Sequence, residues 1–264
     1  MRIAAAQILS TGDPEKNLVT VTEAVREAAA GGARVVVLPE ASSQAFGTGR
    51  LDERAEELDG PFAEGVRAVA EETGTVVVVG MFRPADQAFH DGRTVNRVFN
   101  TALIVGDGVD EHYDKVHTYD AFDYEESATV KPGGRVVTFD VDGVRLGVAI
   151  CFDLRFPELF RELACRGAHA VVVPTSWADG PGKLEQWLLV TRARAMDTGC
   201  YIVGADQALP EGETDGPTGV GHSVVVGPDA SVLEEAGDRR GIIYADIDTE
   251  AVAKQRRVLP VLPR

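Results

Sequence analysis

Short valine-rich runs alternate along the chain with segments of helical periodicity, and this alternation constrains the fold more than any other feature of the sequence. In the first half, strand-like runs at residues 2–7, 34–40 and 75–80 are separated by helical patterns at 14–31 and 61–73. A strand–helix–strand order requires crossover connections, which place helices over the faces of a largely parallel sheet. The sequence therefore predicts an α/β fold.

The second half repeats this order. A strand-like run at 145–153 is followed by a helical pattern from Pro157 and then by the valine run 171–173. Two similar α/β halves are one interpretation, and a chance match between common helix–strand junctions is the other. Because no linker or low-complexity tract separates the halves, we expect one domain over residues 1–264 with two packed sheets.

Local signals define the ends of some elements. Asp13 is placed to cap the first helix, Pro14 lies in its first turn, and Gly31 ends it. The C-terminal segment 256–264 contains two prolines and no helical period, so we expect it to form an extended tail.

Composition limits the partners and the compartment of the protein. The net charge of −16 opposes binding to nucleic acid, whose phosphates would be repelled over most of the surface. No run of apolar residues is long enough to span a membrane, and the N-terminus is typical of a strand rather than a signal peptide.

The three cysteines, Cys151, Cys165 and Cys200, are odd in number and lack metal or redox spacing, which predicts reduced thiols in a cytoplasmic protein. We expect Cys165 and Cys200 to be buried.

Cys151 is the most unusual of the three cysteines. It ends an apolar strand, and Asp153, Arg155 and Glu158 follow within seven positions. One interpretation is a core cysteine, since free cysteine is among the most buried residue types. The other is a nucleophile on a strand-to-helix turn, which needs a base and a charge stabiliser from elsewhere in the chain.

Two other residues match those needs. Glu40 follows a proline that ends its strand, so it lies at the carboxyl edge where open α/β sheets bind ligands. A solvated acidic loop residue is the alternative. Lys115 lies in a polar and aromatic segment, 111–127, where it either extends to solvent or holds a developing charge. His117 in the same segment is either a base or an ordinary loop histidine.

Together, Glu40, Lys115 and Cys151 form a chemically complete set for acyl transfer. A thiol pKa of about 8.5 and a carboxyl pKa of about 4.3 are mismatched by roughly four units. We expect burial to raise the pKa of Glu40, and Lys115 with a helix N-terminus to lower that of Cys151, which closes most of this gap. Lys115 and the backbone N–H of Phe152 could then hold the oxyanion of a tetrahedral intermediate.

Motifs for other chemistries are missing from the sequence. There is no G-x-S-x-G elbow, no H-E-x-x-H or paired-cysteine zinc signature, and no G-x-G-x-x-G after a strand. We therefore expect neither a metal site nor an organic cofactor.

Three separated motifs resemble the signature regions of the nitrilase superfamily of carbon–nitrogen hydrolases. They are LPE at 38–40, YDKVH at 113–117 and ICFDLRFPELFRELACRGAHAVVVPTSW at 150–177. The segments 124–133 and 191–207 also fit, so the resemblance extends over nearly the whole chain.

This resemblance implies a four-layer α-β-β-α sandwich that pairs through its helices into a homodimer or a larger homo-oligomer. It implies Glu40 as general base, Lys115 as oxyanion stabiliser and Cys151 as nucleophile. A further family glutamate, which positions the lysine and the attacking group, matches Glu126, although the adjacent Glu125 leaves that register ambiguous.

Within the superfamily, residues 151–158 and 192–197 are most similar to the amidase branch that includes ω-amidase and deaminated-glutathione amidase. Enzymes of this branch hydrolyse a terminal amide on a small acid, which implies release of ammonia through a cysteine thioester. A nitrilase or an N-carbamoyl amino acid hydrolase with the same three residues is the alternative. A non-catalytic module is disfavoured because Glu40, Lys115 and Cys151 are all present.

Arg155, Lys183 and Trp177 are the candidate substrate contacts. Arg155 either anchors a substrate carboxylate or pairs with Asp153 or Glu158 and braces the turn. The bracing role is favoured because the three charges lie within six residues. Lys183 is a second candidate anchor or a surface lysine. Trp177 either walls the pocket or packs in a core or interface.

Overall fold

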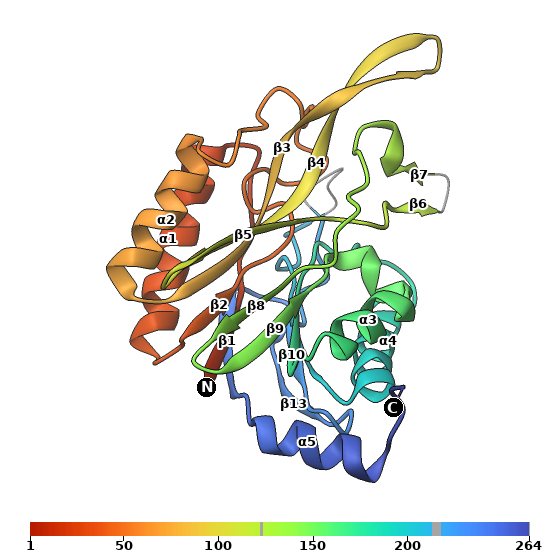
Figure 1. Cartoon of the computed structure of the whole chain (residues 1–264). Coiled ribbons are helices and arrows are strands. Elements are labelled where there is room, and N and C mark those ends of the chain that lie inside the picture. Colours follow the sequence, from red (N-terminus) through yellow and green to blue (C-terminus); the bar gives the residue numbers. More distant parts are fainter. Residues whose placement is uncertain (122–123, 213–217, 264) are drawn as a thin grey trace.

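Over residues 1–121, 124–212 and 218–263, which the computed structural model describes, the chain forms two six-stranded sheets (Figure 1). The first sheet contains, in spatial order, β14 (Gly241–Asp246), β1 (Arg2–Gln7), β2 (Val35–Val37), β3 (Val76–His90), β4 (Arg93–Gly106) and β5 (Val109–Asp114). The second contains β13 (Val232–Glu235), β12 (Val224–Val226), β11 (Tyr201–Ala205), β10 (Ala170–Pro174), β9 (Val144–Val148) and β8 (Thr138–Val141). A separate strand pair joins β6 (Asp120–Ala121) to β7 (Tyr124–Glu125).

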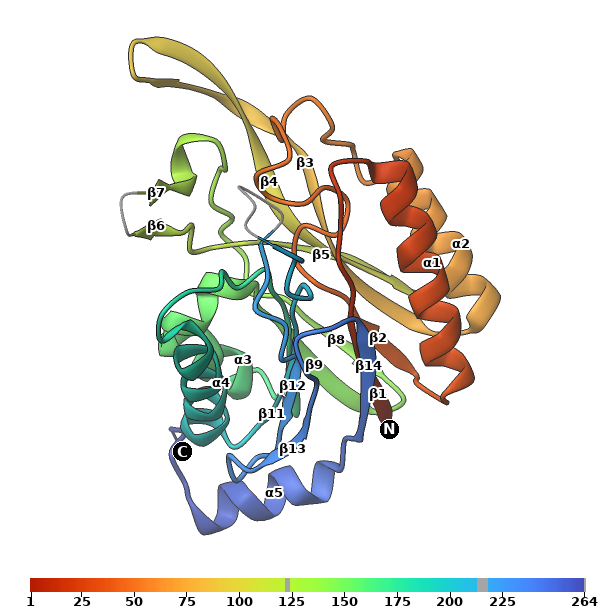
Figure 2. The same ribbon diagram turned by 180° about the vertical axis from the view of Figure 1, so that it is seen from behind.

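Helices cover the outer faces of both sheets (Figures 1 and 2). The helices α1 (Pro14–Ala30) and α2 (Pro61–Thr73) pack on the first sheet, and α3 (Pro157–Cys165) and α4 (Lys183–Thr198) pack on the second. The last helix, α5 (Thr249–Val258), follows β14. The two inner layers are therefore sheets and the two outer layers are helices, which confirms the predicted four-layer α-β-β-α sandwich.

The alternation of side chains along β1 explains the layering. Ala4 and Ala6 pack with α1 and α2, while Ile3 and Ala5 belong to the core shared with the second sheet. Successive side chains of a strand point to opposite faces, so a strand that is apolar throughout is buried on both. The continuous apolar runs of β1, β2, β10 and β11 are thus explained.

The two halves of the chain have matching topology. Strands β1, β2 and β3 are parallel neighbours, as are β9, β10 and β11, and each trio continues into two antiparallel strands. On its other side each trio borders one antiparallel strand, β14 or β8. The predicted similarity of the halves is therefore present in the fold, whether it arose by duplication or by chance.

The ends of the first helix agree with the sequence. The Asp13 carboxylate accepts a hydrogen bond from the N–H of Glu15 at 3.1 Å, and Pro14 is the first residue of α1. Gly31 is the C-terminal cap. A capping side chain satisfies backbone donors that the first turn leaves free.

Three local predictions were wrong. Strand β3 continues beyond the predicted run 75–80 and forms with β4 a long two-stranded arm, which carries no apolar pattern because much of it is exposed (Figure 1). The first three residues of the predicted extended tail, 256–258, belong to α5, whose only buried residue is Val252, so no apolar stripe marked this helix; residues 259–263 are outside any helix or strand. Cys165 is exposed, because the buried face of α3 is formed by the residues just before it. Cys200 is buried, as predicted.

Candidate active site

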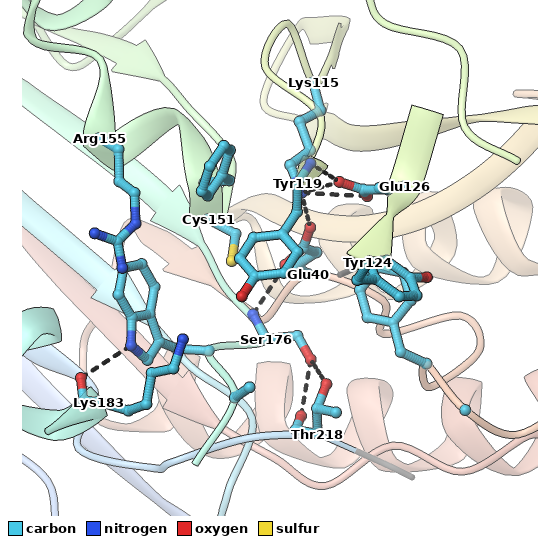
Figure 3. A pocket seen from close by; sticks show the side chains of 15 residues that line it. Glu40, Lys115, Tyr119, Tyr124, Glu126, Cys151, Arg155, Ser176, Lys183 and Thr218 are labelled. Carbon is cyan, nitrogen blue, oxygen red and sulfur yellow. Dashed lines mark hydrogen bonds and ion pairs between the residues drawn. The ribbon is translucent and has the colours of Figure 1, made fainter. Parts of the chain in front are cut away.

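The four residues that resemble the family's catalytic set follow strands of both large sheets and of the β6–β7 pair, and they meet at one place. Glu40 follows β2, and Lys115 follows β5 directly. Cys151 opens the short 3-10 turn η2 (Cys151–Arg155) after β9, and Glu126 opens the 3-10 turn η1 (Glu126–Ala128). All four line one pocket with a volume of about 360 Å³ (Figure 3). Strand ends in this fold thus bring together residues that are up to 111 positions apart in the chain.

Lys115 lies between two carboxylates. Its Nζ is 2.9 Å from Oε1 of Glu40 and 3.0 Å from Oε2 of Glu126 (Figure 3). Burial by itself lowers the pKa of Lys115, but the charges of Glu126 and Glu40 outweigh this effect and raise its pKa well above the usual value. The side chain is therefore a permanent ammonium. Glu126 is buried whereas Glu125 is exposed, so Glu126 is the residue that faces the lysine.

Glu40 is held through both carboxylate oxygens. Oε1 accepts hydrogen bonds from Lys115 and from Nδ2 of Asn100, at 2.9 and 2.7 Å. Oε2 accepts from the backbone N–H of Ser176, at 3.0 Å. Glu40 is only 1% exposed, so its orientation is determined by these protein donors. The alternative of a solvated acidic loop residue is excluded.

Cys151 is buried beside this set with a backbone φ of +44°. A non-glycine residue in this region is uncommon and persists only where the surrounding structure holds it. Burial, followed by the charge of Glu40, raises the pKa of Cys151 well above its usual value, despite an opposing effect of Lys115. Lys115 does lower this pKa, as expected, but burial and Glu40 outweigh it, so the expected net lowering was wrong. The ammonium is already shared by two carboxylates, and α3 begins only at Pro157.

Asp153 holds the turn that carries the thiol. Its Oδ2 accepts from the N–H of Ile150 at 2.9 Å and from the Tyr113 hydroxyl at 2.8 Å. Its Oδ1 accepts from the backbone N–H of His117 at 3.0 Å and lies 2.7 Å from the ring Nδ1 of the same residue. This carboxylate thus joins the segments on both sides of Lys115 to the segment around Cys151. His117 therefore has a structural role in its loop.

Arg155 does not brace the turn, and that prediction was wrong. Asp153 is fully engaged by other donors, and the described residues include no ion pair of Arg155 with Asp153 or Glu158. Instead the guanidinium donates to Oε1 of Gln186 at 2.7 Å and lies 5.1 Å from the ring centre of Trp177. Its Nε is buried and has no hydrogen-bond partner in the part of the chain that the structure describes.

Aromatic side chains, two cations and four small residues form the rest of the pocket. Its further lining residues are Phe46, Gly47, Tyr119, Tyr124, Phe152, Arg155, Ser176, Trp177, Ala178, Lys183 and Thr218. Lys183 and Arg155 lie on the same side of Cys151 in Figure 3. Trp177 is in the pocket wall, and its indole N–H donates to the carbonyl of Lys183 at 3.0 Å. All three predicted substrate contacts are therefore in the pocket, and Phe152 follows the thiol directly.

Sequence reasoning missed two buried polar residues next to the set. Asn100 donates to both site carboxylates, and Asp206 accepts from the backbone N–H groups of Trp177 and Val220 at 2.7 and 3.0 Å. Burial raises the pKa of Asp206 well above its usual value, although these hydrogen bonds oppose the rise. Asn100 and Asp206 each lie beside an apolar run of the sequence, 102–105 and 201–205, which was the available signal.

The part of the chain that the structure describes holds neither a metal cluster nor a membrane-spanning helix. No group of three or more His, Cys, Asp or Glu side chains there is arranged to hold a metal ion. No helix in those same residues is both long and apolar enough to cross a membrane.

Comparison with known proteins gives a consistent set of relatives. The family model for carbon–nitrogen hydrolases matches residues 2–257. A hydrolase of Mycobacterium tuberculosis is 46% identical over 273 residues, covering 99% of this chain and 94% of that protein. Omega-amidase NIT2 of Homo sapiens is 32% identical over 269 residues, covering 98% and 93%. The crystal structure of Saccharomyces cerevisiae Nit3, a member of branch 10 of the nitrilase superfamily, aligns with a TM-score of 0.83 at 28% identity, covering 100% and 96%.

Proposed function

Since the chain belongs to the carbon–nitrogen hydrolase family and is an amidase-type enzyme, we propose that it hydrolyses the terminal amide of a small molecule that carries a carboxylate. Ammonia is released, and the acyl group passes through a thioester on Cys151. The observation that carries this proposal is one thiol, one ammonium and two carboxylates in a single pocket whose wall also presents Arg155.

The proposed first step follows from the charges in the pocket. The raised pKa of Cys151 keeps the thiol protonated at neutral pH, so the proton must leave during attack rather than before it. Glu40 takes this proton as the sulfur bonds to the amide carbonyl carbon. The carbonyl oxygen becomes an oxyanion, which the Lys115 ammonium and the Phe152 N–H stabilise.

Collapse of this intermediate breaks the carbon–nitrogen bond. The proton on Glu40 passes to the leaving nitrogen, and ammonia departs while the acyl group stays on sulfur. Glu40 then removes a proton from water, which attacks the thioester, and the same proton returns to the sulfur. One amide and one water are consumed, and one carboxylic acid and one ammonia are formed. Glu126 acts by holding the lysine.

Arg155 is the proposed anchor for the substrate carboxylate. Arg155 lines the pocket and is partly exposed, and its Cζ lies 5.1 Å from the ring centre of Trp177. A substrate carboxylate in the pocket can pair with this guanidinium, because arginine presents its N–H groups in a geometry that suits carboxylates. Lys183, whose Nζ is 5.9 Å from the Tyr119 ring centre, is the second candidate.

The proposal is tested by ammonia release from matched amides. Glutaramate carries a terminal amide and a carboxylate, whereas pentanamide has a similar chain without the charge. We expect turnover of glutaramate or its 2-oxo analogue by the wild type and none by Cys151→Ala. Turnover of a nitrile or an N-carbamoyl amino acid alone would overturn the amide assignment.

The anchor is tested separately with Arg155→Ala. Because a hydrogen bond to a charged group contributes about 1.5–3 kcal/mol, we expect a KM for the acidic amide that is roughly 10- to 100-fold higher. Activity on the neutral amide should change little. Lys183→Ala is the matched control, and a KM effect confined to Lys183→Ala would transfer the anchor role to Lys183.

We also propose that the protein forms a homodimer or larger homo-oligomer through its helices. The outer face of α4 exposes Leu189 and Met196, which are 67% and 45% accessible. Large apolar side chains gathered on one surface mark interaction sites. Sedimentation of the wild type beside Leu189→Asp tests this, and a monomeric wild type would contradict it.

A further inference from the structure

Asn100 lies on β4 directly behind the charged groups of the pocket. Its Nδ2 donates to Oε1 of Glu40 at 2.7 Å and is 3.3 Å from Oε1 of Glu126. Its backbone carbonyl accepts from the N–H of Lys115 at 2.8 Å. Asn100 is 1% exposed and is not among the residues that line the pocket. One neutral residue therefore contacts both glutamate carboxylates and the backbone of the lysine between them, and it does not line the pocket.

The amide of Asn100 is used on one side only. Because both neighbours are carboxylates, the NH₂ group must face them and the carbonyl must point away. That carbonyl oxygen, Oδ1, is buried and has no hydrogen-bond partner in the described chain. A buried polar atom without a partner is destabilising and needs an explanation. The explanation here is what the NH₂ group does for the two glutamates.

The charges in the site show why a neutral donor is needed. The Lys115 ammonium faces Glu40 and Glu126, so one positive charge opposes the two negative charges of these carboxylates. The other titratable groups that act on Glu40 or are influenced by it are the Cys151 thiol, the Tyr124 phenol and the buried carboxyl of Asp206. None of them adds a positive charge. A proton taken up by Glu40 would relieve the repulsion and disable it as a base.

We propose that Asn100 is a positioning residue that keeps Glu40 ionised and directed at the thiol by donating one amide hydrogen to each glutamate. This inference rests on the proposed role of Glu40 as the base that deprotonates Cys151. An amide donates at every pH and cannot itself bind or release a proton in this range. Asparagine can therefore stabilise two carboxylates together without changing the charge of the site.

Two substitutions separate this role from simple packing. Asn100→Ala removes the hydrogen bond that this amide donates to the Glu40 carboxylate, so the reactivity of Cys151 should fall more at low pH than at high pH. Asn100→Asp has nearly the same shape, but its carboxyl must be protonated to donate. In this variant the reactivity of Cys151 should therefore fall as the pH rises, because the introduced carboxyl loses the proton that it donates. A residue that only packs would lower reactivity by the same factor at every pH.

The test is alkylation of Cys151 by iodoacetamide as a function of pH, followed by mass spectrometry of the cysteine peptides. This readout reports the thiol and its base and does not depend on which amide is the substrate. Cys165, which is exposed on α3, is an internal control in every sample. Thr101→Val is the matched variant, because Thr101 is equally buried on the same strand and its hydroxyl donates to Asp114 rather than to the site glutamates.

The acid limb is the low-pH part of the profile, in which the rate of Cys151 alkylation rises with pH. We expect this limb to move to higher pH in Asn100→Ala and to stay in place in Thr101→Val. An unmoved limb in folded Asn100→Ala would overturn the inference. If Asn100→Ala does not fold, Asn100→Asp decides, since loss of its reactivity with rising pH supports the role and a wild-type profile refutes it. A shifted limb in a protein that hydrolyses none of the tested amides would leave the inference standing and overturn only the proposed substrate.

Discussion

Replacing Asp153 with alanine should disconnect the two segments that carry Lys115 and Cys151. Asp153 is fully buried and accepts hydrogen bonds from Tyr113, Ile150 and His117. These donors lie on both sides of Lys115 and immediately before Cys151. The left-handed backbone of Cys151 then loses the acceptor that holds the preceding N–H, and such a conformation persists only when its surroundings enforce it.

The magnitude follows from the donors that are left behind. The Tyr113 hydroxyl and the Ile150 N–H belong to residues with no exposed surface, and Asp153→Ala removes the acceptor that each uses. A buried donor left unsatisfied costs about 1–3 kcal/mol, so the two together cost about 2–6 kcal/mol. His117 is only partly buried, and water can replace Asp153 there. The loss is large against a total stability of about 5–15 kcal/mol.

The assay is urea unfolding followed by tryptophan fluorescence, since Trp177 and Trp187 are both buried. The matched control is Asp140→Ala, which removes a carboxylate with 57% side-chain exposure paired with Arg145. Exposed ion pairs contribute about 0–1 kcal/mol, so this variant should remain close to the wild type. If the free energy of unfolding of Asp153→Ala lies within about 1 kcal/mol of that of the control, the role given to this carboxylate is wrong.

Three further outcomes are expected. A Cβ at Gly80 would lie 2.6 Å from the Cα of Glu40, so Gly80→Ala should destabilise the protein by about 1–3 kcal/mol and lower amide turnover; an unchanged melting temperature would contradict this packing. Lys115→Met should abolish turnover and destabilise the protein by about 3–5 kcal/mol, because two buried carboxylates lose their counter-charge. A melting temperature equal to that of the wild type would count against the site geometry. Hydrogen bonds from Arg97 lower the pKa of Asp86 from 3.8 to about 2, so its contribution to stability is present above the unfolded value and is lost as pH falls toward 2; a carboxyl NMR titration with a midpoint near 3.8 would refute this.

Several features of the fold could be predicted from local patterns. The crossover topology follows from apolar runs that alternate with helical periods, and Asp13 and Gly31 mark the ends of α1. The predictions failed for α5 and for the arm of β3 and β4, where most of the surface is exposed. Exposed elements are stabilised by backbone pairing and caps, which leave no apolar periodicity in the sequence.

The sequence by itself determined the order of the buried strands and of the first helices, because this order depends on residue type and on spacing along the chain. Its resemblance to a known family implied the layered architecture and the residues that accompany Cys151. Only the tertiary structure decided that Asp153 binds Tyr113 and His117 rather than Arg155, and that Asn100 lies behind both glutamates. It also decided that the thiol pKa is raised. The physical reason is that hydrogen bonds and charge effects are determined by separations of a few ångströms in space, and the groups that come within that range are distant in sequence.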